Sequence, residues 1–251
     1  MTNSVEVIPV EGIPEVAFGD PLGALIARAT GEEIGSEDVV VVSQKIVSKA
    51  EGRVVRLADV EPSGRAHELA RRLGKDPRLV ELIIRESARV VRAERDVLIV
   101  ESRAGWISAN AGIDASNIPE ADQVTLLPVD ADASARRLRA ELREVTGATP
   151  GVVVGDSFGR PWRLGQVDVA IGCAGIQPLD DWRGRHDRHG GELTATVIAV
   201  ADELAAAADL VRTKDEGLPA ALLRGVGRFV TPDDGPGAAA LRRPREEDLF
   251  R

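Results

Sequence analysis

The sequence predicts an α+β protein, with mixed and antiparallel sheets and flanking helices. Three observations lead to this fold class. Short runs of β-branched apolar residues, such as residues 39–47, are typical of strands. Longer segments with apolar residues three and four apart, such as residues 130–147, indicate amphipathic helices. The two kinds of segment do not alternate strictly along the chain, which disfavours a doubly wound parallel sheet.

The expected strands share a high content of valine, isoleucine and leucine. In chain order they are residues 5–10, 39–47, 89–102, 151–157 and 220–230. Residues 39–47 begin with four consecutive valines and contain six apolar side chains in nine, so this strand is expected to be buried on both faces. Residues 89–102 resemble a hairpin that runs on to Trp106.

The expected helices share apolar stripes and recognisable ends. In chain order they are residues 20–31, 76–87, 130–147 and 193–212. Asp76 and Pro77 form a typical helix start, as N-cap and first helical residue. Gly31 and Gly147 are expected to end their helices. In the helix over 130–147, one buried face is expected to carry Leu138, Leu142 and Val145.

Composition excludes several classes of protein. The chain has 251 residues, of which 43% are hydrophobic and 29% charged, as in ordinary globular proteins. It contains no apolar run of the ~20 residues that cross a bilayer and no export signal. The single cysteine, Cys173, excludes an intrachain disulfide, so a cytoplasmic protein is expected. A net charge of −9 argues against nucleic-acid binding and requires local cations or bound metal for any anionic substrate.

Two aspartates beside apolar segments are the first candidates for chemistry. Asp114 lies in NAGIDASN (residues 110–117), and Asp156 follows the strand GVVVG. If the fold brings them together, both carboxylates and the Ser157 hydroxyl would form an oxygen-rich pocket suited to Mg²⁺. The alternative is that both aspartates only cap turns.

Cationic side chains follow two of these segments. Arg160 and Arg163 lie in GDSFGRPWRLGQ, interpreted as one short loop, and have guanidinium groups suited to carboxylate or phosphate. Lys45 and Lys49 leave the end of a buried strand and could hold phosphates, although a solvated loop is the common alternative. A third segment, residues 181–193, combines an aromatic ring with several cations and fits an anionic planar ligand better than zinc.

Several of these motifs together resemble one family, the γ-glutamyl ligases of coenzyme F-420. The matching blocks are VEGIP, VVVSQKIVSKAEGR, NAGIDASN, GDSFGRPWRLGQVDVAIGCAGI, DWRGRHDRHGGEL and TVIAVADELAAAADLV, which occur in this order between residues 5 and 230. The resemblance implies a GTP-dependent ligase that adds L-glutamate to the coenzyme F-420 precursor. It also implies a homodimer.

The resemblance assigns roles to residues that match the family motifs. The residues implied in GTP binding are Glu11, Gly12, Ile13, Pro14, Ser43, Lys49, Asn117 and, in a segment that departs from the family pattern, Lys214 and Glu216. Asp114, Asp156 and Ser157 are the implied ligands of two Mg²⁺ or Mn²⁺ ions, and K⁺ is a further family expectation. Arg160 is assigned to anion binding in catalysis. The substrate residues are expected to be Arg163, Trp182 and Arg183.

The resemblance also implies a domain organisation. Residues 1–230 are expected to form the ligase domain, as two intertwined subdomains. Residues 231–251 are expected to be a charged tail, which in the bifunctional form of the family would link to a nitroreductase-like domain. The implied reaction activates the acceptor carboxylate as an acyl phosphate. The rival functions are a metal-dependent nucleotide phosphohydrolase and a non-catalytic GTP-binding regulatory module.

Overall fold

A five-stranded sheet forms the centre of the protein. The computed structural model describes residues 4–31, 33–116, 122–213 and 215–249. The strand order is β1 (Glu6–Pro9), β12 (Ala220–Arg224), β2 (Val39–Ser43), β8 (Gly151–Arg160) and β9 (Arg163–Ala174). Strands β2 and β8 are parallel, and the other neighbours are antiparallel. This mixed sheet confirms the predicted α+β class.

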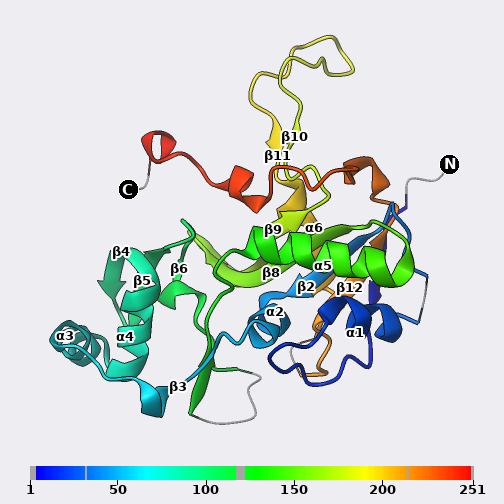
Figure 1. Cartoon of the computed structure of the whole chain (residues 1–251). Helices are drawn as coiled ribbons and strands as arrows, with labels where there is room; N and C mark the ends of the chain where they lie inside the picture. The colour runs from blue at the N-terminus through cyan, green and yellow to red at the C-terminus, as the bar shows by residue number, and fades with distance from the viewer. Residues whose placement is uncertain (1–3, 32, 117–121, 214, 250–251) are drawn as a thin grey trace.

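Helices cover both faces of this sheet (Figure 1). One face packs against α1 (Leu22–Ala29), α2 (Gln44–Ala50) and α5 (Ala131–Thr146), and the other against α6 (Val200–Asp209). Val40 and Val42 enter the first core, while Val39 and Val41 enter the second. Because side chains alternate along a strand, an all-valine segment supplies both cores. The predicted burial of this strand on both faces is therefore confirmed.

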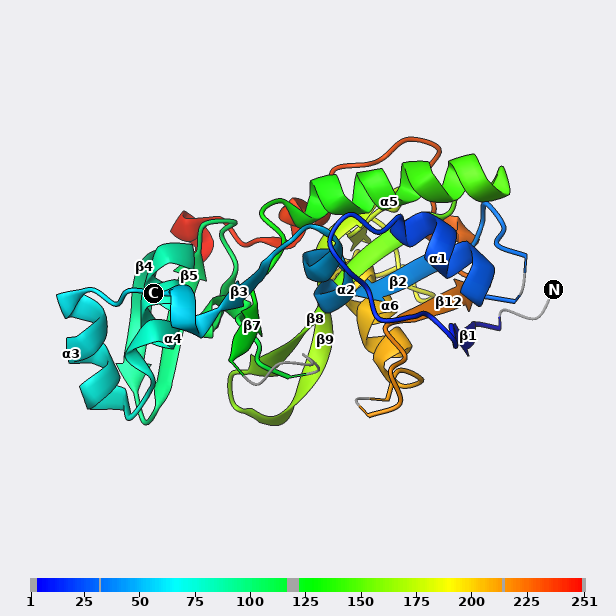
Figure 2. The ribbon, with the colours of Figure 1, turned by 60° about the horizontal axis from the view of Figure 1, so that its bottom comes forward.

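A smaller unit lies to one side of the main sheet (Figure 2). It contains α3 (Gly64–Leu73), α4 (Pro77–Glu86) and a three-stranded sheet of β4 (Ser87–Glu94), β5 (Val97–Ser102) and β6 (Ile107–Ala109). A two-stranded pair, β3 (Val54–Arg56) and β7 (Gln123–Thr125), leads into and out of it. The unit has its own core around Ile83, Leu98 and Val100.

The chain after α5 has two further features. A loop between the short strands β10 (Asp180–Asp181) and β11 (Val197–Ile198) projects from the body (Figure 1). Beyond β12 come the 3₁₀ turns η3 (Gly227–Phe229), η4 (Ala238–Leu241) and η5 (Arg245–Glu247). Ala238 is fully buried, so part of the predicted tail packs against the body. Among the described residues, no helix is long and apolar enough to span a bilayer.

Five sequence predictions of local structure are wrong. The strand expected over 39–47 ends at Ser43, whose side chain caps α2 instead. The helix expected over 193–212 begins only at Val200, and Leu193 precedes it in an extended loop. The expected strand 220–230 ends at Arg224 because the chain turns at Gly225, where φ is +80°. Val145 is 52% exposed, so the apolar face of α5 ends earlier than its spacing suggested.

The fifth error concerns GDSFGRPWRLGQ, which is not a loop. It forms the ends of β8 and β9, joined by a two-residue turn at Pro161 and Trp162. Trp162 has a φ of +57° there and is 82% exposed. The paired strands continue beyond the rest of the sheet and project as a hairpin (Figure 2).

Candidate functional site

A large cavity lies where the parallel pairing of β2 with β8 ends, at the carboxyl end of β2. Its volume is about 770 Å³. The carboxyl edge of a sheet is where α/β proteins commonly bind ligands. Five segments far apart in sequence line the cavity: the loop after β1, the end of β2 with α2, the loop of Asp114 and Ser116, the β8–β9 hairpin and the segment from the end of α6 to β12.

The parallel pairing explains why sequence-distant polar residues meet here. Ser43, the last residue of β2, is in register with Gly155 of β8. The next residues of β8, Asp156 and Ser157, therefore reach the same edge, and both line the cavity with Ser43. At this point the buried valine runs of both strands end. The apolar runs fix the register of the two strands in the core, and the polar residues that follow them therefore lie together at the cavity.

Asp114 enters the cavity from the smaller unit. Its backbone forms an isolated antiparallel bridge with Thr125, at the end of β7. Its carboxylate forms an ion pair with Lys45 of α2, at 2.9 Å, and accepts a hydrogen bond from the backbone N–H of Ser116. Although burial opposes the shift, Lys45 and Ser116 hold the pKa of Asp114 below its ordinary value. Asp114 is therefore ionised at neutral pH.

Asp156 has the opposite environment. Burial raises its pKa to about 7, and the charges of Asp168 and Asp114 add to the effect, although the backbone N–H of Ser157 opposes it. Among the described residues, no cation forms an ion pair with Asp156. Lys45 lowers the pKa of Asp156 only in part, so this half-buried carboxyl group beside two other carboxylates favours binding of a further cation.

Two residues of this network were not singled out from the sequence, Asp168 of β9 and Arg212 after α6. They form an ion pair and are only 3% and 5% exposed. Asp168 also accepts a hydrogen bond from the hydroxyl of Ser157, at 2.6 Å. This bond commits the Ser157 proton to Asp168 and fixes the orientation of the hydroxyl. A lone aspartate in the apolar strand VDVAIG was the available signal, because a buried charge requires a partner.

The cavity is acidic overall. Six carboxylates and three cations are among the described residues that line it. Each cation is ion-paired with a carboxylate of the same cavity: Lys45 with Asp114, Lys49 with Glu15 and Arg212 with Asp168. A polyphosphate would therefore meet a site in which the positive charge is already neutralised. Divalent metal would reverse that balance.

The donor set fits such a metal. Asp114, Asp156 and Ser157 all line this one cavity, and each has a side-chain oxygen that can bind a metal ion. Among the described residues, no group of three or more His, Cys, Asp or Glu side chains forms a metal site by itself. Mg²⁺ does not need such a group, since it is commonly held by one or two carboxylates, water and substrate phosphates.

Only some of the other residues predicted to bind the nucleotide line the cavity. Ile13, Pro14, Ser43 and Lys49 line the cavity. Glu11 and Gly12 precede that lining and are exposed, and Glu216 accepts a hydrogen bond from Thr213 at its margin. Asn117 and Lys214 lie outside the described residues. Their assignments remain predictions.

The predicted anion and substrate residues do not line this cavity. Arg160 donates a hydrogen bond to the carbonyl of Leu164 near the hairpin tip, and Arg163 is exposed beside it. Arg183 pairs with Asp181 in the projecting loop, where the ring of Trp182 contacts Arg185. For these residues to act in this cavity of the same chain, the hairpin tip or the projecting loop would have to move.

Comparison with known proteins identifies the family. The model of the family described as F420-0:Gamma-glutamyl ligase matches residues 12–225. The chain belongs to this family. It is 45% identical over 251 residues to a protein of Methanothermobacter thermautotrophicus named Coenzyme F420:L-glutamate ligase, covering 98% of this chain and 99% of the relative.

Two further relatives carry the same name. The protein of Methanopyrus kandleri is 45% identical over 252 residues, covering 100% of this chain and 98% of the relative. That of Haloarcula marismortui is 44% identical over 254 residues, covering 98% and 96%. The family resemblance drawn from the sequence motifs is confirmed. The match to the F420-0:Gamma-glutamyl ligase family includes every described segment of the cavity.

Proposed function

We propose that this protein is a GTP-dependent ligase that joins L-glutamate to the coenzyme F420 precursor. Family membership supports the ligase activity and its two substrates. The observation that carries the GTP and metal dependence is the acidic cavity, which brings Asp114, Asp156 and Ser157 together. Their oxygen atoms are suited to divalent metal bound with a phosphorylated substrate.

In this proposal the cavity residues have three roles: metal binding, phosphate binding and positioning of Ser157. Asp114, Asp156 and Ser157 would hold Mg²⁺ or Mn²⁺, which supplies positive charge for the phosphates. Lys45 and Lys49 are now paired with Asp114 and Glu15. When these carboxylates interact with the metal ion instead, both lysines can contact phosphate oxygens. Asp168 and Arg212 fix the Ser157 hydroxyl.

The proposed chemistry has two steps. A carboxylate oxygen of the acceptor attacks the γ-phosphorus of GTP, forming an acyl phosphate as the bond to GDP breaks. The amine of L-glutamate then attacks the acyl carbon, an amide bond forms, and inorganic phosphate leaves while the amine proton passes to solvent. No protein nucleophile is required, so catalysis depends on positioning and charge.

Mass spectrometry tests this proposal directly. Purified protein is incubated with GTP, Mn²⁺, L-glutamate and the unglutamylated precursor. We expect one or more added glutamyl units, with none when GTP is omitted or the metal is chelated. Phosphate release from GTP without glutamate and acceptor would support a phosphohydrolase instead. GTP binding without any turnover would support a regulatory module.

The metal assignment has its own test. Asp114→Ala should lower kcat by about a hundredfold or more, because it removes a charge from the reacting centre. Asp59→Ala is the matched control, since Asp59 is exposed in η1 (Leu57–Asp59) and outside the cavity. Near-normal turnover of Asp114→Ala with Mg²⁺ would contradict the assignment.

A further inference from the structure

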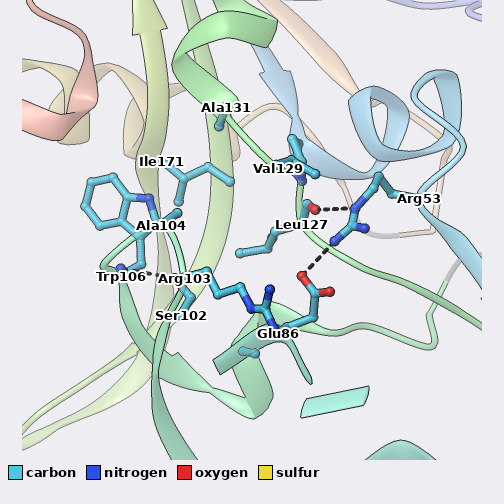
Figure 3. Close-up of a pocket in the computed structure, with 12 residues that line it drawn as sticks. Arg53, Glu86, Ser102, Arg103, Ala104, Trp106, Leu127, Val129, Ala131 and Ile171 are labelled. Carbon is cyan, nitrogen blue, oxygen red and sulfur yellow. Dashed lines mark hydrogen bonds and ion pairs between the residues drawn. The ribbon is translucent and has the colours of Figure 1, made fainter. Parts of the chain in front are cut away.

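A second cavity lies on the side of Trp106, where the smaller unit meets the main body. It has a volume of about 200 Å³. Figure 3 shows Trp106 on one side, Leu127 and Val129 on the other, and Arg103 with Glu86 below them. We call this space the Trp106 cavity. It shares no lining residue with the acidic cavity described above.

Two solvent-accessible hydrogen-bond donors in the lining of the Trp106 cavity have no partner among the described residues. The guanidinium of Arg103 makes no ion pair or hydrogen bond among the described residues, and its backbone N–H donates to the carbonyl of Glu86. The indole N–H of Trp106 is also without a partner in the described part of the chain. By contrast, Arg53 is held by Glu86 and the carbonyl of Leu127. The unpaired donors favour a ligand with anionic or acceptor oxygens.

The aromatic and apolar side chains of the lining favour the ring of a ligand. A space of about 320 Å³ adjoins the Trp106 cavity and shares Ala104, Trp106, Val129, Ala131 and Ile171 with it. Together the two spaces reach the size of ordinary small-molecule sites. Val129 is 74% exposed in this lining, so its apolar side chain is accessible to a ligand. The guanidinium of Arg242 already lies over the Trp106 ring, at 5.8 Å from its centre.

The chain places the Trp106 cavity close to the acidic cavity. Arg53, in the wall of the Trp106 cavity, follows Lys49 of the acidic cavity by four residues. Leu127 follows Thr125 by two residues, and Thr125 is bridged to Asp114. Since consecutive Cα atoms are ~3.8 Å apart, the two walls lie within about 15 Å of each other. One elongated ligand could therefore occupy both.

We infer that the Trp106 cavity binds the planar heteroaromatic ring of an anionic ligand. This inference rests on the proposed function, in which that ring belongs to the acceptor whose carboxylate reacts in the acidic cavity. The Trp106 indole and the apolar side chains contact the ring, and Arg103 pairs with an anionic or acceptor group. The acceptor is then recognised at two places, its ring in one cavity and its reacting end in the other.

Flavin mononucleotide (FMN) is a suitable probe because it combines a tricyclic heteroaromatic ring with a phosphate. Its fluorescence anisotropy is titrated with the full-length chain in the absence of GTP and glutamate. Arg103→Glu and Trp106→Leu should each raise the Kd for FMN by about tenfold or more. The matched controls are Arg71→Glu, on the exposed surface of α3, and Trp162→Leu, at the hairpin tip. Both should leave the Kd within about twofold.

Three results would overturn the inference. They are absence of FMN binding by the unmodified chain up to about 1 mM, equal binding by all four variants, and displacement of FMN by saturating GTP. If Trp106→Leu does not fold, Arg103→Glu decides, because the Arg103 side chain is exposed and makes no contact that folding requires.

The glutamylation assay separates this inference from the proposed function. Arg103→Glu should raise the KM for the acceptor while leaving the KM for GTP unchanged. Glutamyl transfer with an acceptor KM insensitive to Arg103 and Trp106 would overturn the inference and keep the function. FMN binding that depends on both residues, without any glutamyl transfer, would keep the cavity assignment and overturn the function.

Discussion

At the scale of single residues, Asp156 combines a proposed metal-binding role with a loss of stability. Its pKa is raised to about 7 in the folded chain, above its ordinary value of 3.8. The folded state therefore binds an extra proton between these values, and stability falls as pH rises from about 4 to 7. Asp156→Asn should remove this fall and stabilise the metal-free protein, by on the order of 2–4 kcal/mol at pH 8. It should also abolish metal-dependent turnover.

Thermal unfolding from pH 4 to 8, with and without Mg²⁺, measures this effect. Asp114→Asn is the control, since the Asp114 carboxylate is paired with Lys45 and its pKa is lowered. That control should destabilise the protein or leave it unchanged. If the metal-free Asp156→Asn protein is less stable than the parent at pH 8, the ionised Asp156 carboxylate does not destabilise the folded state.

At the scale of elements, one carboxylate joins α3 to α4. Glu81 of α4 accepts hydrogen bonds from the hydroxyl and backbone N–H of Ser63, the N-cap of α3, at 2.6 and 3.0 Å. These bonds lower the pKa of Glu81 to about 2. The stability that they contribute is therefore present above pH 4.5 and is lost as pH falls towards 2.

Glu81→Gln should lower the free energy of unfolding by about 1–2 kcal/mol at pH 7. The difference in the free energy of unfolding between variant and parent should become smaller at pH 3. At this pH, Glu81 of the unfolded parent chain is protonated, so the parent loses part of the stability that its carboxylate contributes. Urea unfolding at the two pH values measures both effects. Glu68→Gln, an exposed position on α3, is the matched control. An equal loss of stability at both pH values would show that charge at Glu81 is unimportant.

At the scale of the whole molecule, the segment after β12 ties the main body to the smaller unit. Asp132 of α5 accepts hydrogen bonds from the backbone N–H groups of Cys173 and Ala238, at 2.8 and 2.7 Å. Farther along, Arg242 donates to the carbonyl of Ala104, beside the three-stranded sheet. This segment therefore crosses the junction between the two parts of the protein (Figure 1).

Asp132→Ala should release this segment, because it leaves buried N–H groups without acceptors at a cost of about 1–3 kcal/mol each. Limited proteolysis followed by mass spectrometry should then show new cleavage between residues 231 and 245. Asp130→Ala is the matched control, because it removes the N-cap of the same helix at a cost of about 1 kcal/mol. Equal protection of the segment in both variants would show that Asp132 does not hold it.

The amino-acid sequence by itself determined the features that depend on neighbours along the chain. Asp76 and Pro77 begin α4 as predicted, Gly147 ends α5, and residues 89–102 contribute to a hairpin. Caps, turns and apolar periods act within a few residues, so they can be recognised without the fold. The family motifs also identified Asp114 and Asp156 as candidate partners, although their meeting depended on the fold.

Only the tertiary structure decided which polar groups share a cavity. The parallel register of β2 and β8 brings Ser43 beside Asp156, and the Asp168–Arg212 pair joins strand β9 to the segment after α6. The same structure separates Arg160 and Trp182 from this cavity, although their sequence composition suggested anion binding. Such arrangements depend on pairings between distant segments, whose register is set by burial of both sheet faces. No local pattern contains that information.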